Sequence, residues 1–212
     1  MSDTIEPKQA RSRKTVARLL AATVDTLDAH GLAGTTIPRI AEAAGVAPAS
    51  IYRRFRDKEA LIRATLLDVL ERSNAVNAAA VAPMLEGRSL AWVAGALARS
   101  LVLQYRVRPG LMRALIRFAE SDTDAAFKER AMTLMTENLR MIVEEIVARF
   151  ADEIEHPDPR HAVTFAALAV ANIAETHALE EFSLWHAALP LTDDELQRDL
   201  KRLFLGYLRV AP

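Results

Sequence analysis

The sequence predicts an all-α protein with about nine helices and no sheet. Apolar residues recur at helical spacing along nearly the whole chain, and no sustained alternation of apolar and polar residues, the pattern of a strand, occurs. Aromatic residues make up only 6% of the chain and alanine is abundant, which also favours helices. With 212 residues the chain can bury a substantial core, and we expect a small N-terminal domain joined to a larger helical one.

Acidic and basic side chains balance over the whole chain but not along it. The 27 Lys and Arg residues against 28 Asp and Glu residues give a formal net charge of −1. Residues 8–63 hold eleven basic and five acidic side chains, a net +6, so the remainder carries −7. A basic segment on an acidic body favours a polyanionic partner for that segment, although chance scatter produces such an excess fairly often.

The composition excludes several classes of site. The chain has no Cys, which excludes disulfides, thiolate zinc sites and cysteine nucleophiles. The first seven residues lack the apolar core of a secretory signal, and the longest apolar stretch, 162–174, is too short to span a bilayer. We therefore expect a soluble, cytoplasmic protein without a membrane partner.

An enzyme is the main alternative from another functional class. The sequence has no G-x-S-x-G elbow, Walker loop, Rossmann fingerprint or H-E-x-x-H motif. Helix capping explains the acidic cluster at Glu120, Asp122 and Asp124, and Glu175 and His177 are two residues apart and so point to different faces of a helix. We expect no catalytic activity, no cofactor and no metal site.

Start and stop residues define the helices of the first quarter. A stripe of apolar residues predicts a helix over 12–29, and Thr36 is the expected cap of a short helix that ends at Gly45. A second short helix is predicted from Pro48 to Phe55, followed by a longer one capped by Asp57. Two short helices joined by a tight turn, after a longer helix, form the layout of a helix-turn-helix unit.

Longer helices are predicted for the rest of the chain. Each begins at a capping residue or at a proline in its first turn. The expected helices cover 89–106, 109–120, 124–150, 159–182 and a final segment that begins with the capping box Thr192–Glu195.

Ten or more positions of the helix-turn-helix segment follow one fixed order and spacing. They are Thr35-Thr36, Ile40-Ala41, Ala44-Gly45-Val46, Ile51-Tyr52, Phe55 and Lys58-Glu59-Ala60-Leu61. On these residues the segment resembles the TetR-type transcriptional regulators over about residues 10–65, and the remainder is similar in plan to that family's regulatory domain. The resemblance implies a flexible segment 1–10, a DNA-binding domain 11–57 and a regulatory and dimerisation domain 58–212.

The chain departs from that family's usual pattern around the second short helix. Family members often have Ser or Thr where this chain has Ala47, and Gly where it has Ala49. They commonly have an aromatic residue and His in place of Arg53 and Arg54. A missing capping side chain costs about 0.5–2 kcal/mol, and the two arginines imply a different sequence preference on DNA.

The resemblance also implies which side chains contact DNA. Thr36, Tyr52 and Lys58 are expected at phosphates, and Arg39 at the DNA backbone. The residues expected at base edges are Pro48, Ala49, Ser50, Arg53 and Arg54, and Arg11, Arg13 and Lys14 are expected to form an arm along the backbone. On an arbitrary helix, Tyr52 would be interpreted as half-buried and the arginines as a solvated face.

The last two long helices are predicted to form a homodimer through a four-helix arrangement. Small residues in the first helix allow close approach, and the spacing suits near-parallel crossing. The expected interface residues are Ala167, Ala171, Ala174, Ala178, Leu196, Leu200, Leu203, Phe204 and Tyr207. The alternative is that these stripes face the subunit's own core.

A pocket for a small hydrophobic effector is implied by the resemblance. The candidate residues are Trp92, Tyr105, Met112, Phe118, Met132, Met135, Asn172 and His177. Met and aromatic residues at helical spacing are more often core residues, whereas the two polar residues on an apolar helix need partners in the ligand, in each other or in a dimer mate.

The expected function is that of a dimeric repressor, released from a palindromic double-stranded operator by an unidentified small hydrophobic effector. Two alternatives stay open at this point. One is a helical regulator without an effector, and the other is an interaction protein whose DNA-binding unit no longer works.

Overall fold

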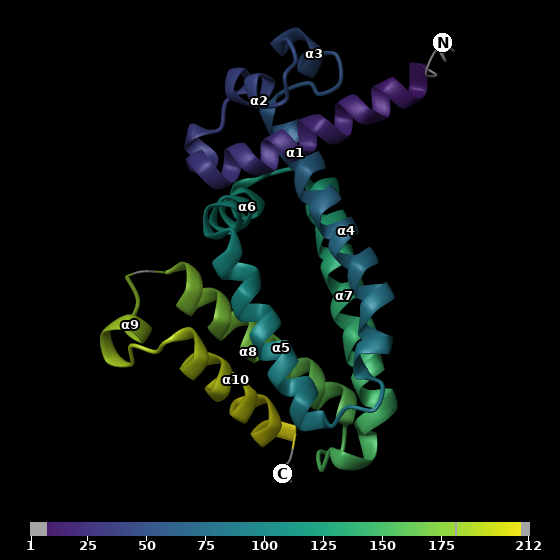
Figure 1. Cartoon of the computed structure of the whole chain (residues 1–212), viewed down its shortest axis with the longest axis vertical. Helices are drawn as coiled ribbons and strands as arrows, with labels where there is room; N and C mark the ends of the chain where they lie inside the picture. Colours follow the sequence, from purple (N-terminus) through teal and green to yellow (C-terminus); the bar gives the residue numbers. More distant parts are fainter. Residues whose placement is uncertain (1–7, 181, 209–212) are drawn as a thin grey trace, which may run out of the picture. The chain divides into compact units, whose positions relative to one another are not determined.

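The structure is a computed structural model that describes residues 8–180 and 182–208, and within these residues every regular element is a helix (Figure 1). The predicted all-α fold class is therefore confirmed. The α-helices are α1 (Lys8–Gly34), α2 (Ile37–Ala43), α3 (Pro48–Tyr52), α4 (Lys58–Leu85), α5 (Leu90–Val107), α6 (Pro109–Ser121), α7 (Ala125–Phe150), α8 (Pro159–Leu179), α9 (Leu184–Ala188) and α10 (Asp193–Leu208), with a 3-10 turn at Ala151–Glu153.

The capping residues that the sequence indicates do begin their helices. Ser89 Oγ accepts from the backbone N–H of Trp92 at 3.2 Å, and an Asp158 carboxylate oxygen accepts from that of His161 at 3.0 Å. At the start of α10 the backbone N–H of Thr192 donates to the Glu195 carboxylate at 2.9 Å, and the Glu195 N–H donates to Thr192 Oγ1 at 3.3 Å. This reciprocal pair is the predicted capping box.

One short helix and several helix ends differ from the prediction. The first helix runs over Lys8–Gly34 instead of 12–29, and α3 ends at Tyr52 instead of Phe55. α8 stops at Leu179 instead of Phe182 because Glu180 has an extended backbone, with φ −100° and ψ 95°. α9 spans five residues, its N-cap Ser183 makes no side-chain capping bond, and none of its residues is buried. A helix this short has no detectable apolar stripe, so the sequence pattern does not predict it.

The chain forms two compact units. The N-terminal unit comprises residues 1–71 and 110–131, of which the structure describes those from residue 8 onward, and the C-terminal unit comprises residues 72–109 and 132–212 with the gaps given above. The helices α4 and α7 therefore contribute residues to both units, and α6 contributes only its first residue, Pro109, to the C-terminal unit.

The core of the helix-turn-helix lies between α1, α2, α3 and the start of α4. Leu19, Ile40, Ile51 and Leu61 are each fully buried in one apolar cluster. Burying an aliphatic side chain of this size contributes about 1.5–3 kcal/mol, and α2 and α3, of seven and five residues, are too short to be stable without it. The packing on α1 therefore sets the position of α3.

A close backbone contact joins α6 to α1 within the N-terminal unit. The Asp28 carboxylate accepts from the backbone N–H of Leu111 at 3.0 Å, at the start of α6. A Cβ atom added to Gly110 would lie 2.2 Å from the Asp28 carbonyl oxygen, closer than any real side chain approaches. Glycine is required at residue 110 because α1 leaves no room for a side chain.

The C-terminal unit is built on α5, α8 and α10, which pack against one another. Phe165 near the start of α8 stacks on Tyr207 near the end of α10, so these two helices are antiparallel (Figure 1). The α8 residues that face the other two helices are mostly small, with Ala162, Ala166 and Ala174 fully buried. Small side chains let the helix axes approach closely.

The expectation that no apolar stretch is long enough for a bilayer is wrong for α8. The helix runs over 21 residues and is long and apolar enough, by length and composition only, to cross a membrane. Nine of its residues are buried against the rest of the unit. Its apolar composition is thus explained by its place in the protein core, because a buried core helix meets the same criteria of length and composition.

We predict that Gly110→Ala destabilises the N-terminal unit by about 1–3 kcal/mol, because the added methyl group overlaps the Asp28 carbonyl oxygen. Urea unfolding monitored by circular dichroism measures the change. The matched control is Gly206→Ala in α10, where nothing lies within 4 Å of the added Cβ, so that the helix gains up to about 1 kcal/mol. Equal stability of the two variants would contradict the steric argument.

Candidate nucleic-acid interface

The turn between α2 and α3 aims the second helix outward. Gly45 has a φ of 60°, the left-handed conformation that glycine adopts without strain, and the next backbone N–H, of Val46, donates to the Ala41 carbonyl at 2.9 Å. Fully buried Ile51 anchors α3 on the core. The opposite face of α3 is thereby turned to solvent.

An arginine that the sequence analysis did not select holds this turn. Arg18, on α1, donates through Nη2 to the carbonyl oxygen of Ala44 and, at 3.2 Å, to that of Gly45. These carbonyls lie at the C-terminal end of α2, where a cation is favoured. The sequence places Arg18 on the predicted helix 12–29, outside its apolar stripe. Spacing alone does not say which turn the side chain reaches.

The face of α3 that is turned to solvent carries the predicted base-contacting residues. Pro48, Ala49 and Arg53 are exposed, and Ser50 is half-buried. Tyr52 is 58% exposed, so the interpretation of this ring as half-buried core is not what the structure shows. Arg53 Nη2 donates to Ser50 Oγ at 2.9 Å, a surface hydrogen bond that DNA can replace.

Arg54 is held more firmly than Arg53. Its Nη1 donates to the Ser50 carbonyl at 2.9 Å, one turn back along α3, and its Nε is buried without a hydrogen-bond partner among the described residues. A base contact by Arg54 would exchange the Ser50 carbonyl for a base acceptor. The two adjacent arginines therefore differ in how readily they can reach DNA.

The start of α2 presents a second group of polar side chains. Thr36 is exposed and is the N-cap, and its Oγ1 accepts from the Arg39 backbone N–H at 3.5 Å. Arg39 is also exposed, and its Nη1 donates to the Gly34 carbonyl at 2.6 Å. The free N–H groups of a helix N-terminus together with a cation suit a phosphate.

The start of α4 places Lys58 beside a strong cap. An Asp57 carboxylate oxygen accepts from the Ala60 backbone N–H at 2.7 Å, and Arg56 Nε donates to the same carboxylate at 2.8 Å. The backbone bond first, and then Arg56, lower the pKa of Asp57. Lys58 Nζ lies 3.9 Å from the Glu59 carboxylate, a loose surface pair that leaves the amine available.

The predicted basic arm is described only in part. Arg13 and Lys14 are exposed on α1, which is helical from Lys8 onward. The side chain of Arg11 and the first seven residues of the predicted segment 1–10 lie outside the described part of the chain.

The predicted effector-contacting residues are divided between the two units. Met112 and Phe118 belong to the N-terminal unit, where Phe118 packs edge-on against Phe127 with ring centroids 5.9 Å apart. The other candidates lie in the C-terminal unit, where Trp92, Met132, Met135 and Asn172 are exposed and Tyr105 and His177 are buried.

Two polar candidates of the C-terminal unit differ in what they contact. Asn172 is exposed on the surface of the single subunit, so a partner for its amide in a ligand or a dimer mate stays a prediction. The Tyr105 hydroxyl donates to the Glu175 carboxylate at 3.1 Å, and burial, together with Glu175, raises the pKa of Tyr105. His177 is fully buried.

Most residues predicted for the dimer interface pack inside one chain. Ala167, Ala174, Ala178, Leu196, Leu200 and Phe204 are buried in the single subunit, and Ala171 is half-buried. The stripe faces the subunit's own core because α5 packs against both α8 and α10. Leu203, 42% exposed, and half-buried Tyr207 lie on the outer side, together with exposed Phe165 and Leu168.

The helix-turn-helix matches a known family. Residues 19–65 match the family model described as "Bacterial regulatory proteins, tetR family". The helix-turn-helix segment over residues 19–65 is therefore of the tetR-family type. No curated protein sequence matches the chain. The match covers the two short helices and the start of α4, which are the elements that position the exposed side chains described above.

Solved structures share the fold of this chain. A TetR family transcription regulator from Marinobacter aquaeolei VT8 is 19% identical and matches over 94% of this chain and 98% of its own, with a TM-score of 0.60. The fatty acid degradation regulator FadR from Bacillus halodurans is 18% identical over 92% and 96%, with a TM-score of 0.65. FadR from Bacillus subtilis in complex with stearoyl-CoA is 13% identical over 91% and 97%, with a TM-score of 0.62. The chain thus has the fold of TetR-family transcriptional regulators.

The described side chains do not indicate a metal centre. In residues 8–180 and 182–208, no group of three or more His, Asp or Glu residues is placed to hold a metal ion.

The second helix of the tetR-family unit lacks a side-chain cap, as predicted from the departure at Ala47. Ala47 is the N-cap of α3, with φ −69° and ψ 143°, and makes no capping hydrogen bond. We predict that Ala47→Ser stabilises the domain by about 0.5–2 kcal/mol, because Ser Oγ can accept from a free N–H of the first turn. Thermal unfolding measures the gain. The matched control, Ser89→Ala, removes the existing cap of α5 and should cost a similar amount.

Proposed function

We propose that this protein is a sequence-specific DNA-binding repressor of the tetR family that acts as a homodimer in the cytoplasm, without catalytic activity, and is released from a palindromic operator by a small hydrophobic effector. The observation that carries the DNA-binding part is the exposed face of α3. Tyr52 and Arg53 project into solvent from a helix whose other face is fixed by fully buried Ile51. A large exposed aromatic ring beside a cation is unfavourable on a free surface but suits a phosphate and base edges.

We assign the roles within this interface from the contacts that each side chain makes. Thr36 and Lys58 bind phosphates, because one sits at a helix N-terminus and the other is loosely paired. Tyr52 donates its hydroxyl to the backbone, and Arg39 contacts the backbone beside it. Base edges are read by Pro48, Ala49, Ser50, Arg53 and Arg54. The proposed DNA-binding domain is 11–57, and the regulatory and dimerisation domain is 58–212.

The effector part of the proposal is supported by apolar side chains that the C-terminal unit leaves exposed. Met132 and Met135 of α7 are 60% and 45% exposed, and Trp92 is exposed as well. The flexible Met side chains can adapt to the shape of a ligand. FadR from Bacillus subtilis, which shares the fold, holds stearoyl-CoA. A regulator without an effector would have the same DNA interface, and a thermal-shift screen with fatty acyl and aromatic compounds distinguishes the two.

We predict that Arg53→Ala/Arg54→Ala abolishes the selection of a palindrome from random duplex DNA. Each lost base contact costs about 1–3 kcal/mol of binding free energy at one position. Lys58→Ala should instead weaken binding to all sequences alike and reduce the salt dependence of binding by about one phosphate contact. Sequencing of the selected duplexes and titration at several salt concentrations measure both effects. The control is Arg117→Ala, which removes an exposed cation of the same unit from α6. Unchanged selection by the double variant would contradict the proposed interface.

The dimer interface that we propose is an apolar strip on the outer side of α8 and α10. Phe165 and Tyr207 stack with ring centroids 4.7 Å apart, and one helical turn further along these antiparallel helices lie Leu168 and Leu203. The four side chains come from the two helices named in the sequence analysis, but mainly from their outer faces. An exposed apolar strip of this kind is typical of an interaction surface.

We predict that Leu168→Glu weakens dimer formation by about 100-fold, because a charge that costs at least about 1.4 kcal/mol enters a two-fold interface twice. Sedimentation velocity at several protein concentrations measures the change. The control is Val76→Glu, which changes an apolar residue of α4 that is 64% exposed, against 53% for Leu168. Dissociation by the control, or a monomeric unmodified protein, would contradict the strip as the interface.

A further inference from the structure

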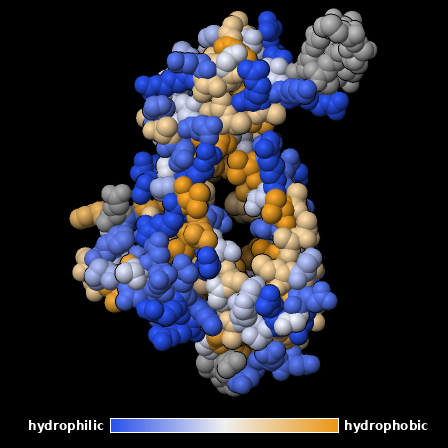
Figure 2. All heavy atoms as spheres, viewed as in Figure 1, coloured by the Kyte–Doolittle hydropathy of each residue, from blue (hydrophilic) through white to orange (hydrophobic). Residues whose placement is uncertain are grey.

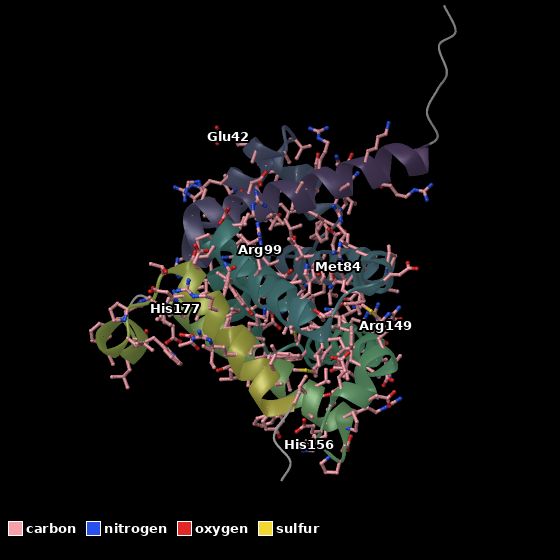
Figure 3. All side chains as sticks on the ribbon, turned by 60° about the horizontal axis from the view of Figure 1, so that its bottom comes forward. Glu42, Met84, Arg99, Arg149, His156 and His177 are labelled. Carbon is pink, nitrogen blue, oxygen red and sulfur yellow. The ribbon has the colours of Figure 1, made fainter. Side chains whose placement is uncertain are left out.

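A group of polar side chains meets at the end of α8 in the C-terminal unit. His177, labelled in Figure 3, is fully buried. Its ring lies 4.7 Å, centroid to centroid, from that of His186 on α9. Arg106 of α5 places Nη2 3.5 Å from His177 Nδ1 and donates through Nη1 to the Ala178 carbonyl at 3.3 Å. Asp193 of α10 pairs with Arg106 at 3.0 Å.

The contact with Arg106 determines the state of the His177 ring. A guanidinium group only donates hydrogen bonds, so the Nδ1 atom that faces it must present a lone pair. The single ring hydrogen is then on Nε2, which is buried and has no hydrogen-bond partner in the described part of the chain. His177 is therefore neutral in this arrangement.

Protonation of His177 conflicts with its surroundings. A second ring hydrogen on Nδ1 would point at the Arg106 guanidinium, inside the unit. Burial first, and then His186 and Arg106, lower the pKa of His177, whereas Asp193 raises it. These are the charged and titratable groups that face the ring from α5, α9 and α10. Their combined effect, with that of burial, favours the neutral form of His177.

We propose that the contact between His177 and His186 is an acid-sensitive latch that holds the α9 segment, residues 182–192, on the end of α8. None of the α9 residues is fully buried, and Ser183 makes no capping bond. Phe182, Leu184 and Leu189 are exposed, and Figure 2 shows hydrophobic side chains at the outer edge of this segment. Acid opens the segment because an imidazolium at residue 177 cannot stay beside Arg106.

The direction and size of the effect follow from the lowered pKa. In the open state His177 is solvated and its pKa returns to about 6.5, so the open state binds a proton that the closed state resists. The latch is at full strength above about pH 6.5 and weakens as the pH falls below that value. One titrating group changes the opening equilibrium by at most about tenfold per pH unit.

Linkage gives this latch a regulatory consequence. A molecule that binds only the closed segment, or only the open one, must bind with an affinity that depends on pH, and its binding must in turn change the protonation of His177. This inference is independent of the proposed DNA interface. It concerns the C-terminal unit whether or not an effector exists.

Hydrogen–deuterium exchange of the full chain tests the latch. The readout is the opening constant of peptides from 182–192 at pH 5.5 divided by that at pH 7.5, after correction for the pH dependence of chemical exchange. We expect a ratio approaching about 10 in the unmodified protein and about 1 in His177→Gln. The control His161→Gln, which removes an exposed histidine from the start of α8, should leave the ratio unchanged.

Two charge variants separate electrostatics from loosening of the structure. Arg106→Met should lower the ratio because the group that repels the proton is gone, and Asp193→Asn should not lower it because the opposing charge is removed. A variant that only loosens the structure raises the opening constant at both pH values and leaves the ratio of the two constants unchanged. A ratio near 1 in the unmodified protein, a ratio retained by His177→Gln, or a ratio that Arg106→Met fails to lower overturns the proposal.

Discussion

The helix-turn-helix depends on one apolar cluster, because its two short helices cannot hold their conformation in water by themselves. Residues from α1, α2, α3 and α4 meet around Ile40 and Ile51, and Arg18 closes the turn between the short helices from outside. Every exposed side chain assigned to DNA takes its direction from this packing. The recognition surface is therefore as rigid as the core beneath it, apart from the uncapped first turn of α3.

The C-terminal unit depends on small residues, which allow its long helices to pack closely. Alanines on α8 allow α5 and α10 to pack closely, and two polar pairs lie near the helix ends, Tyr105 with Glu175 and Arg106 with Asp193. The charge of the chain is divided in a related way, with a basic first quarter and an acidic remainder. Such a division favours the approach of a polyanion to the first quarter only.

The sequence predicted the helices well because capping residues and apolar spacing are local signals. Thr36, Ser89, Asp158 and Thr192 all begin the helices that they were expected to begin. The residues against which each helix face packs are distant in the sequence, so the predictions of packing partners were weaker than those of helix positions. The alanine stripe of α8 could face either its own subunit or a second one, and spacing does not distinguish them, whereas the contact of Arg18 with the Gly45 carbonyl joins residues 27 positions apart.

The contact between Gly110 and the Asp28 carbonyl oxygen bears on how this chain can be compared with distant relatives. Solved structures share its fold at identities of 13–22%, where few positions are expected to agree. A site that admits only a hydrogen atom is constrained by geometry rather than by ligand or operator. Retention of glycine there across divergent sequences would thus trace the docking of α6 on α1, and an insertion beside it would mark a lineage that has rebuilt that junction.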